Sequence, residues 1–294
     1  MSRQFTTVSR IFLLLAILGF CQPAFSQTRI LEVTDGHPVA KAIDLLEGIY
    51  GVPITYEDTI TVNESQMDDI TEKDSRTPDL SRRVMRIKAK TISFAYKLPS
   101  SGASRGVNIG QTQTETESNV DDALSSVLDS YAAAGGLVTF SVTKENGVFH
   151  VIATNFLNRD GKLQQLTPLL DTKITILQKR RTRIALFREI CQSLSEAAGN
   201  DVDIMDFPFN GSATQAQTLT TISGSDVPAR FLLSQLTEEL AAPISLDSTI
   251  HIPGGETQRL NRVVYGGGPI SWRLFYSPDW GYTLHLRKIM PANQ

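Results

Sequence analysis

The sequence predicts an α+β protein made of two tandem small α/β sandwiches, each with two helices packed on one face of a mainly antiparallel or mixed sheet. Amphipathic stretches of helical period alternate with short apolar runs along the whole chain. In addition, Pro38–Ile60 aligns without a gap with Pro228–Ile250, with six identities in 23 positions. We therefore expect each half to read strand, helix, strand, and then strand, helix, strand, strand.

The first 26 residues are typical of a cleaved export signal. Arg3 and Arg10 supply positive charge, and Ile11–Phe20 is an apolar run about half as long as a membrane span requires. Small residues precede Gln27, where we predict cleavage. We therefore expect a periplasmic or secreted protein without a transmembrane anchor after signal cleavage.

Charge and cysteine content exclude several classes of protein. Without Arg3 and Arg10, the 28 basic residues become 26 against 31 acidic ones, a formal charge of −5. This acidity argues against general nucleic-acid binding. Cys191 is then the only thiol, so no internal disulfide is expected. Its place among the apolar residues of a helix predicts a buried side chain rather than a nucleophile.

The first domain is expected over residues 27–160. Pro38 begins a helix that Gly51 ends, Asn119 is a candidate N-cap, and Asn146-Gly147 predicts a tight hairpin turn. The expected elements are the strands Ile30–Val33, Pro53–Tyr56 and Val84–Leu98, the helices Pro38–Tyr50 and Asn119–Tyr131, and the hairpin Leu137–Val142 with Val148–Ala153. Loops are expected at Glu57–Arg83 and Pro99–Ser118.

The second domain is expected over residues 161–294. Gly199 ends one helix, and Ser225 or Asp226 is expected to cap the next. The expected elements are the strands Ile174–Leu177, Val202–Met205 and Ile244–Leu246, the helices Thr182–Ala198 and Val227–Leu240, and the hairpin Ser271–Phe275 with Tyr282–Ile289. Loops are expected at Phe207–Ala216 and His251–Pro269.

Neither a catalytic motif nor a metal or cofactor signature is present. The four histidines have no zinc-site spacing, and a triple glycine at 266–268 lacks the helix and lysine of a phosphate loop. The candidates for acid–base chemistry are His150, His285, Glu57 and Asp58. Their simpler interpretation is as solvent-facing strand residues and turn residues.

Two groups of residues are candidates for binding a partner protein. Aromatic residues gather around the last hairpin, at Trp272, Tyr276, Trp280 and Tyr282, where they either form a binding surface or attach the hairpin to the sheet. Basic residues cluster at Lys179, Arg180 and Arg181. A phosphate or an acidic partner could dock there, although a solvated face is the simpler interpretation.

Two stretches resemble the short N-terminal domain of secretins and TonB-dependent receptors. They are Pro38–Tyr56, with the pattern P-x-x-x-A-I-x-x-L leading to V-P-I-T-Y, and Asp121–Leu128, followed by Gly135 and a strand pair ending at Phe149–Ile152. The resemblance implies a cell-envelope α+β module that binds other proteins without catalysis. The departure from that family is that we expect no pore region, β-barrel or plug domain after these units. The whole chain is similar to uncharacterised secreted bacterial proteins that end in an S-W-R-L-x-Y-x-P hairpin, here Ser271–Pro278.

Our expectation is therefore a non-catalytic interaction module of the bacterial cell envelope, without a cofactor and with another envelope protein as partner. An envelope-polymer hydrolase of unrecognised type is the alternative. A third hypothesis is a scaffold that self-associates through exposed strand edges.

Overall fold

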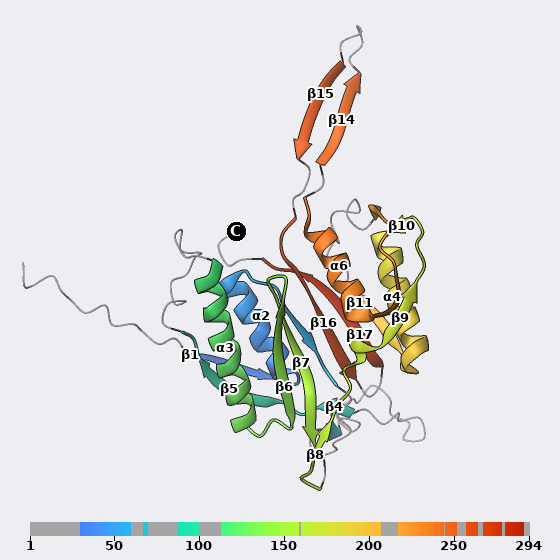
Figure 1. The fold of residues 1–294 in the computed structure, drawn as a ribbon. Helices are drawn as coiled ribbons and strands as arrows, with labels where there is room; N and C mark the ends of the chain where they lie inside the picture. Colours follow the sequence, from blue (N-terminus) through green and yellow to red (C-terminus); the bar gives the residue numbers. More distant parts are fainter. Residues whose placement is uncertain are drawn as a thin grey trace, which may run out of the picture.

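The computed structural model has an α+β fold, as predicted, with four α-helices and mixed sheets in the part of the chain that it describes (Figure 1). The structure describes residues 30–59, 67–69, 87–99, 113–158, 160–206, 217–243, 245–251, 257–263, 267–277 and 280–290. The predicted export signal, the predicted loop Phe207–Ala216 and most of the other predicted loop residues lie outside these ranges.

The first half places two helices between a two-stranded ladder and three strands of a larger sheet. Its elements are β1 (Ile30–Asp35), α2 (Pro38–Tyr50), β2 (Ile54–Glu57), β5 (Ile92–Lys97), α3 (Gln113–Ala133), β6 (Val138–Glu145) and β7 (Val148–Leu157). β1 pairs with β5 in antiparallel fashion. β2 runs parallel to β7, which forms a hairpin with β6.

The second half repeats this topology element by element. Its elements are β9 (Lys173–Ile176), α4 (Arg183–Ala198), β11 (Val202–Asp206), β13 (Gly224–Pro228), α6 (Ala229–Ala241), β16 (Ile270–Ser277) and β17 (Gly281–Lys288). β9 pairs with β13, β11 runs parallel to β17, and β17 forms a hairpin with β16. The chain is therefore a structural duplication in which α2 corresponds to α4 and α3 to α6.

Shorter elements complete the described part. They are β3 (Met67–Asp69), β4 (Ile87–Ala89), β8 (Leu163–Gln165), a 3₁₀ turn (Leu169–Asp171), β10 (Arg181–Thr182), β12 (Leu219–Thr220), β14 (Ser245–His251) and β15 (Thr257–Val263). β14 and β15 pair with each other and extend away from the body (Figure 1). The predicted loop His251–Pro269 is therefore partly strand.

The repeat seen in the sequence is not the repeat of the fold. It aligns α2 with α6, but β2 after α2 lies inside the large sheet, whereas β14 after α6 pairs only with β15 among the described strands. The structural repeat, which pairs α2 with α4, is seen in an equivalent hydrogen bond in each half. Glu47 on α2 accepts the amide of Ile54 seven residues on, and Ser195 on α4 accepts the amide of Val202 seven residues on.

The two halves share one continuous sheet, in the order β11-β17-β16-β2-β7-β6. The junction is the parallel pair of β16 and β2, where Arg273 lies opposite Tyr56. Trp272 and Leu274 point into the second core, and Arg273 between them contacts α2 of the first half. Because successive strand residues face opposite sides, the two helix pairs cover opposite faces of the sheet.

Local signals located most of the element boundaries. The helix Pro38–Tyr50 is confirmed, with Gly51 in the left-handed conformation at φ 66°. The turn residues Asn146 and Gly147 have φ values of 49° and 77°, as the Asn-Gly signal predicts.

Two predicted caps were wrong. α3 begins at Gln113, so Asn119 lies buried within the helix, because the polar residues before it suit the exposed first turns of a helix. α6 begins at Ala229 after Pro228, whose side chain forms no cap, because Ser225 and Asp226 belong to β13, which pairs with β9.

Each half has its own hydrophobic core. The first is centred on Ile43, Leu46, Leu124 and Phe149, and the second on Phe187, Leu194, Leu236 and Leu284. Cys191 is buried in the second core, as predicted. Among the described residues, no helix is long and apolar enough to span a membrane.

Candidate functional site

An apolar hollow of about 450 Å³ lies at the β11 end of the sheet. β11 contributes Asp203 and Met205, and the start of α2 contributes His37. The last hairpin contributes Phe275, Tyr276 and Trp280. The hollow therefore lies on the face of the second half that α4 and α6 leave open, beside the first helix of the other half.

The turn of the last hairpin positions Trp280 at the rim of this hollow. Gly281 has φ 73°, a value that favours glycine, and a Cβ atom there would lie 3.0 Å from the Asp201 carbonyl oxygen. The Tyr282 amide donates to that same oxygen at 2.9 Å, which ties the turn to β11. The Trp280 side chain remains 73% exposed, and Met205 on the neighbouring strand is 65% exposed.

His37 forms the polar wall of the hollow through an ion pair with Asp58. Its Nδ1 atom lies 3.0 Å from Asp58 Oδ2, and its ring centroid lies 5.0 Å from that of Phe275. Burial lowers the pKa of His37, but the hydrogen bond and charge of Asp58, with the charge of Asp35, outweigh it and raise the pKa above the usual 6.5. The pair thereby attaches the start of α2 to the residues that follow β2.

Of the four aromatic residues predicted to bind a partner, two are buried in the second core and two line the hollow. Trp272 is 1% exposed and packs in the second core, and Tyr282 is buried there too. Tyr276 is half-buried against that core and lines the hollow. As a surface prediction, Trp272 and Tyr282 were therefore wrong, because both point to the side of the hairpin that α4 and α6 cover. Tyr276 and Trp280 stay available to a partner.

The three residues of the basic cluster also differ in burial and in their partners. Arg181 is buried and donates to Glu189 at 2.5 Å and to the carbonyl oxygens of Leu177 and Ile222. Lys179 lies 3.1 Å from the same Glu189 carboxylate, while Arg180 is exposed. Burial tends to raise the pKa of Glu189, but Arg181 and Lys179 lower it overall. Arg181 therefore fastens the segment before α4, and a docking surface of three cations is not present.

The four candidates for acid–base chemistry have partners outside their own group. His150 is buried, contrary to its expected solvent-facing position, and its Nδ1 atom lies 2.8 Å from Thr55 Oγ1. Glu57 accepts from Arg230 at 2.6 Å and from the Leu170 amide.

Asp58 pairs with His37, and the His285 ring contacts Phe275. Across the described part of the chain, no group of three or more His, Cys, Asp or Glu side chains is arranged to hold a metal ion.

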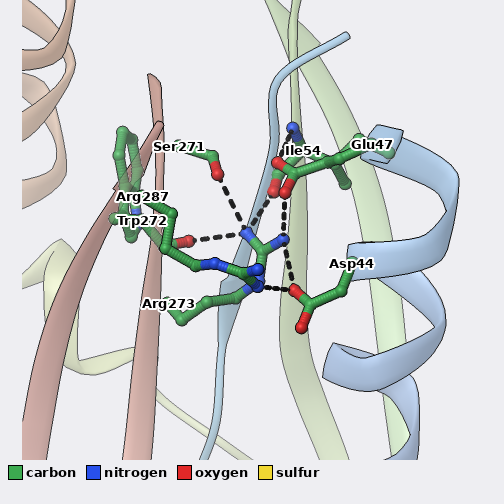
Figure 2. Close-up of polar contacts among 7 residues, drawn as sticks. All are labelled: Asp44, Glu47, Ile54, Ser271, Trp272, Arg273 and Arg287. Atoms are coloured by element: carbon green, nitrogen blue, oxygen red, sulfur yellow. Dashed lines mark hydrogen bonds and ion pairs between the residues drawn. The ribbon is translucent and has the colours of Figure 1, made fainter. Parts of the chain in front are cut away.

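Sequence reasoning missed a buried charge cluster at the junction of the two halves (Figure 2). Arg273 is fully buried, and its Nη2 atom lies 2.6 Å from Glu47 Oε2 and 3.2 Å from Asp44 Oδ1. Its Nη1 atom donates to the carbonyl oxygens of Ile54 and Trp272. Arg287 pairs with Asp44 from the next strand.

A charged residue inside the apolar run S-W-R-L was the one signal for this cluster. The two carboxylate partners of Arg273 lie more than 200 residues away along the chain.

The opposite face of the junction carries a second buried pair. Glu57 on β2 meets Arg230 of α6, which also binds Asp171 at 3.0 Å. Burial raises the pKa of Glu57, and the nearby Arg230 guanidinium and Leu170 amide only partly offset this. Each half thus contributes one buried charged residue that pairs with a helix of the other half: Arg273 with α2, and Glu57 with α6. These two pairs fix the position of one half against the other.

No protein-family model, curated protein or solved structure matches this chain.

Proposed function

We propose that this protein is a non-catalytic interaction module of the bacterial cell envelope that binds a partner protein in the hollow beside Trp280. The observation that carries the proposal is the exposure of Trp280 and Met205 on either side of an apolar hollow that Phe275 and Tyr276 line. Large exposed aromatic side chains beside a preformed apolar hollow are the usual anchors of protein interfaces.

The predicted export signal and the resemblance to the envelope domains support a location in the cell envelope. A small α+β unit present twice suits a protein whose role is to hold another protein. The candidates for the hydrolase alternative are each engaged with other residues, and a hydrolase needs at least two of them to converge on one substrate.

Site-specific photocrosslinking in the cells that naturally produce the protein tests the proposal. A benzophenone amino acid placed at Met205 should capture a defined partner. The matched control is the same group at Leu163 on β8, another exposed apolar residue. Trp280→Ala should reduce the capture about tenfold, the loss expected for one aromatic anchor. Equal capture from both positions, or none from Met205, would contradict the proposal.

Fluorescence gives an independent measurement, because the chain has two tryptophans, of which Trp272 is buried. The part of the tryptophan emission that acrylamide quenches should come from Trp280. Adding the purified partner should reduce this quenching, because the bound partner covers the Trp280 side chain. Trp280→Phe should abolish the quenchable part. Unchanged quenching at saturating partner would place the interface elsewhere.

A further inference from the structure

The duplication indicates what is missing beside β11. In the first half, β2 has β7 on one side and β16 of the other half on the other side. β11 holds the place of β2 in the second half, with β17 on one side. Among the strands that the structure describes, β11 has no neighbour on its other side. The β11 edge is therefore the counterpart of an edge that this fold already uses for parallel strand pairing.

The local contacts of the two strands match at this edge. The first amide of each strand is occupied by a helix side chain, Glu47 for Ile54 and Ser195 for Val202. Pairing with β16 then takes place at Tyr56 and Glu57. In the register with β17, Ile204 and Asp206 take the places of Tyr56 and Glu57, so a strand added to β11 would pair around Ile204 and Asp206, with Met205 in the irregularity between them.

The side chains at this edge define the chemistry of the added strand. Counted along the chain from Val202, Met205 is at the place of Glu57, so an exposed thioether stands where the junction has its buried ion pair. The register with β17 shifts at this point, an irregularity that redirects side chains at sheet edges. Asp203 lies two residues before Met205 and also lines the hollow. An apolar residue beside Met205 and a basic residue beside Asp203 would complement the edge.

A second copy of this chain that paired through β6 would not offer that chemistry. Among the described strands, β6 is the edge strand that corresponds to β16, and the two hairpin registers place Ser141 in the position of Arg273. α3 would replace α6, and their buried residues share one spacing: Val120, Ala123, Leu124, Val127 and Tyr131 against Ala229, Leu232, Leu233, Leu236 and Leu240. This spacing puts Asp121 in the position of Arg230. Asp121 would then face Met205 and would lack the counter-charge that Glu57 gives Arg230 at the junction.

We infer that β11 accepts an extended segment of a different protein, which pairs with the strand edge and places an apolar side chain in the Trp280 hollow. This inference rests on the proposed function and specifies how the partner binds. Strand addition supplies main-chain hydrogen bonds, and the hollow supplies selectivity through alternate side chains. Because the free edge is short, the hollow contributes most of the affinity.

The probe is a displayed library of random short peptides, selected on the full chain and depleted on Trp280→Ala. Enriched peptides should alternate apolar and other residues, with a basic residue near the apolar anchor. Single N-methylation of the peptide amides should weaken binding about tenfold at alternate positions and leave the positions between unchanged, because every second amide of an added strand points to its neighbour. Asp203→Asn should weaken binding, whereas Asp160→Asn, at an exposed site on the β7–β8 turn, should not.

The outcomes separate the two proposals. Peptides that need Trp280 but tolerate N-methylation everywhere, or that lose binding at helical spacing, would overturn strand addition and leave the proposed function standing. If no enriched peptide depends on Trp280, both proposals fail. If the chain itself forms oligomers in light scattering that Met205→Arg dissolves, the occupant is a second copy and the inference is overturned.

Discussion

The Nη2 atom of Arg273 on β16 lies 2.6 Å from Glu47 Oε2 on α2, so a strand of the second half is bonded to a helix of the first. Both side chains are buried, and the other Glu47 oxygen accepts the Ile54 amide at the start of β2. One carboxylate therefore links the end of α2, the start of β2 and the junction strand β16. Together with the pairing of β16 and β2 and the contact of Glu57 with Arg230, this bond links the two halves, which makes it a sensitive place to perturb stability.

Removing the Arg273 charge should destabilise the protein strongly. Arg273→Met leaves Glu47 and Asp44 without their buried cation, and the free energy of unfolding should fall by about 3–5 kcal/mol. Arg180→Gln, at an exposed position, should change the free energy of unfolding by less than about 0.5 kcal/mol. Urea titration measures both. The double variant Arg273→Met with Glu47→Gln should recover part of the loss. Strict additivity of the two single changes would show that the pair is not coupled.

His150 should titrate well below an ordinary histidine. Burial lowers its pKa to about 4, with a smaller contribution from the Arg230 charge. In the unfolded chain His150 takes up a proton near pH 6.5, whereas in the folded protein it does so only near pH 4. The neutral ring therefore contributes to the free energy of unfolding above pH 6.5, and this contribution is lost as the pH falls toward 4. The loss should be on the order of 3 kcal/mol.

Two measurements check the His150 prediction. Histidine NMR should show one ring with a midpoint near pH 4, and His150→Gln should remove that signal. The difference in stability between wild type and His150→Gln should shrink as the pH falls. A His150 midpoint at or above 6.5 would refute the prediction.

Two glycines should respond to alanine in opposite directions. Gly48 lies within α2, and a Cβ atom there meets nothing within 4 Å, so Gly48→Ala should stabilise the protein by about 0.5–1 kcal/mol. A Cβ atom on Gly136 would lie 2.3 Å from the Tyr131 ring, so Gly136→Ala should cost about 1–3 kcal/mol. Thermal or urea unfolding of the two variants decides the signs. A stabilised Gly136→Ala would mean that the Tyr131 ring moves aside freely.

Cys191 should resist thiol reagents while the protein is folded. Burial, with a smaller effect of the Asp203 charge, raises the pKa of its thiol to about 12. The thiolate is the reactive form, so labelling should occur only through unfolding. In a Cys21→Ser background, labelling with a chromogenic disulfide should be negligible in buffer and complete in denaturant. Rapid stoichiometric labelling in buffer would show that the thiol is accessible.

The sequence by itself determined the elements whose signals are local. Pro38 and Gly51 bound α2 as predicted, and the Asn146-Gly147 turn has the backbone conformation that its residues favour. The spacing of apolar residues identified the buried faces of the helices and the place of Cys191. These features depend on steric preferences and burial periodicity over a few residues, which any window of the chain contains.

Only the tertiary structure decided how the elements combine. The best local match paired α2 with α6, but strand pairing makes α2 the counterpart of α4, because register and sheet order depend on contacts between distant segments. Of two tryptophans in one hairpin, Trp272 is buried and Trp280 is exposed, according to which face α4 and α6 cover. The Arg273 cluster and the Trp280 hollow join residues from both halves of the chain. Such a site has no local pattern, since it forms only where two remote faces meet.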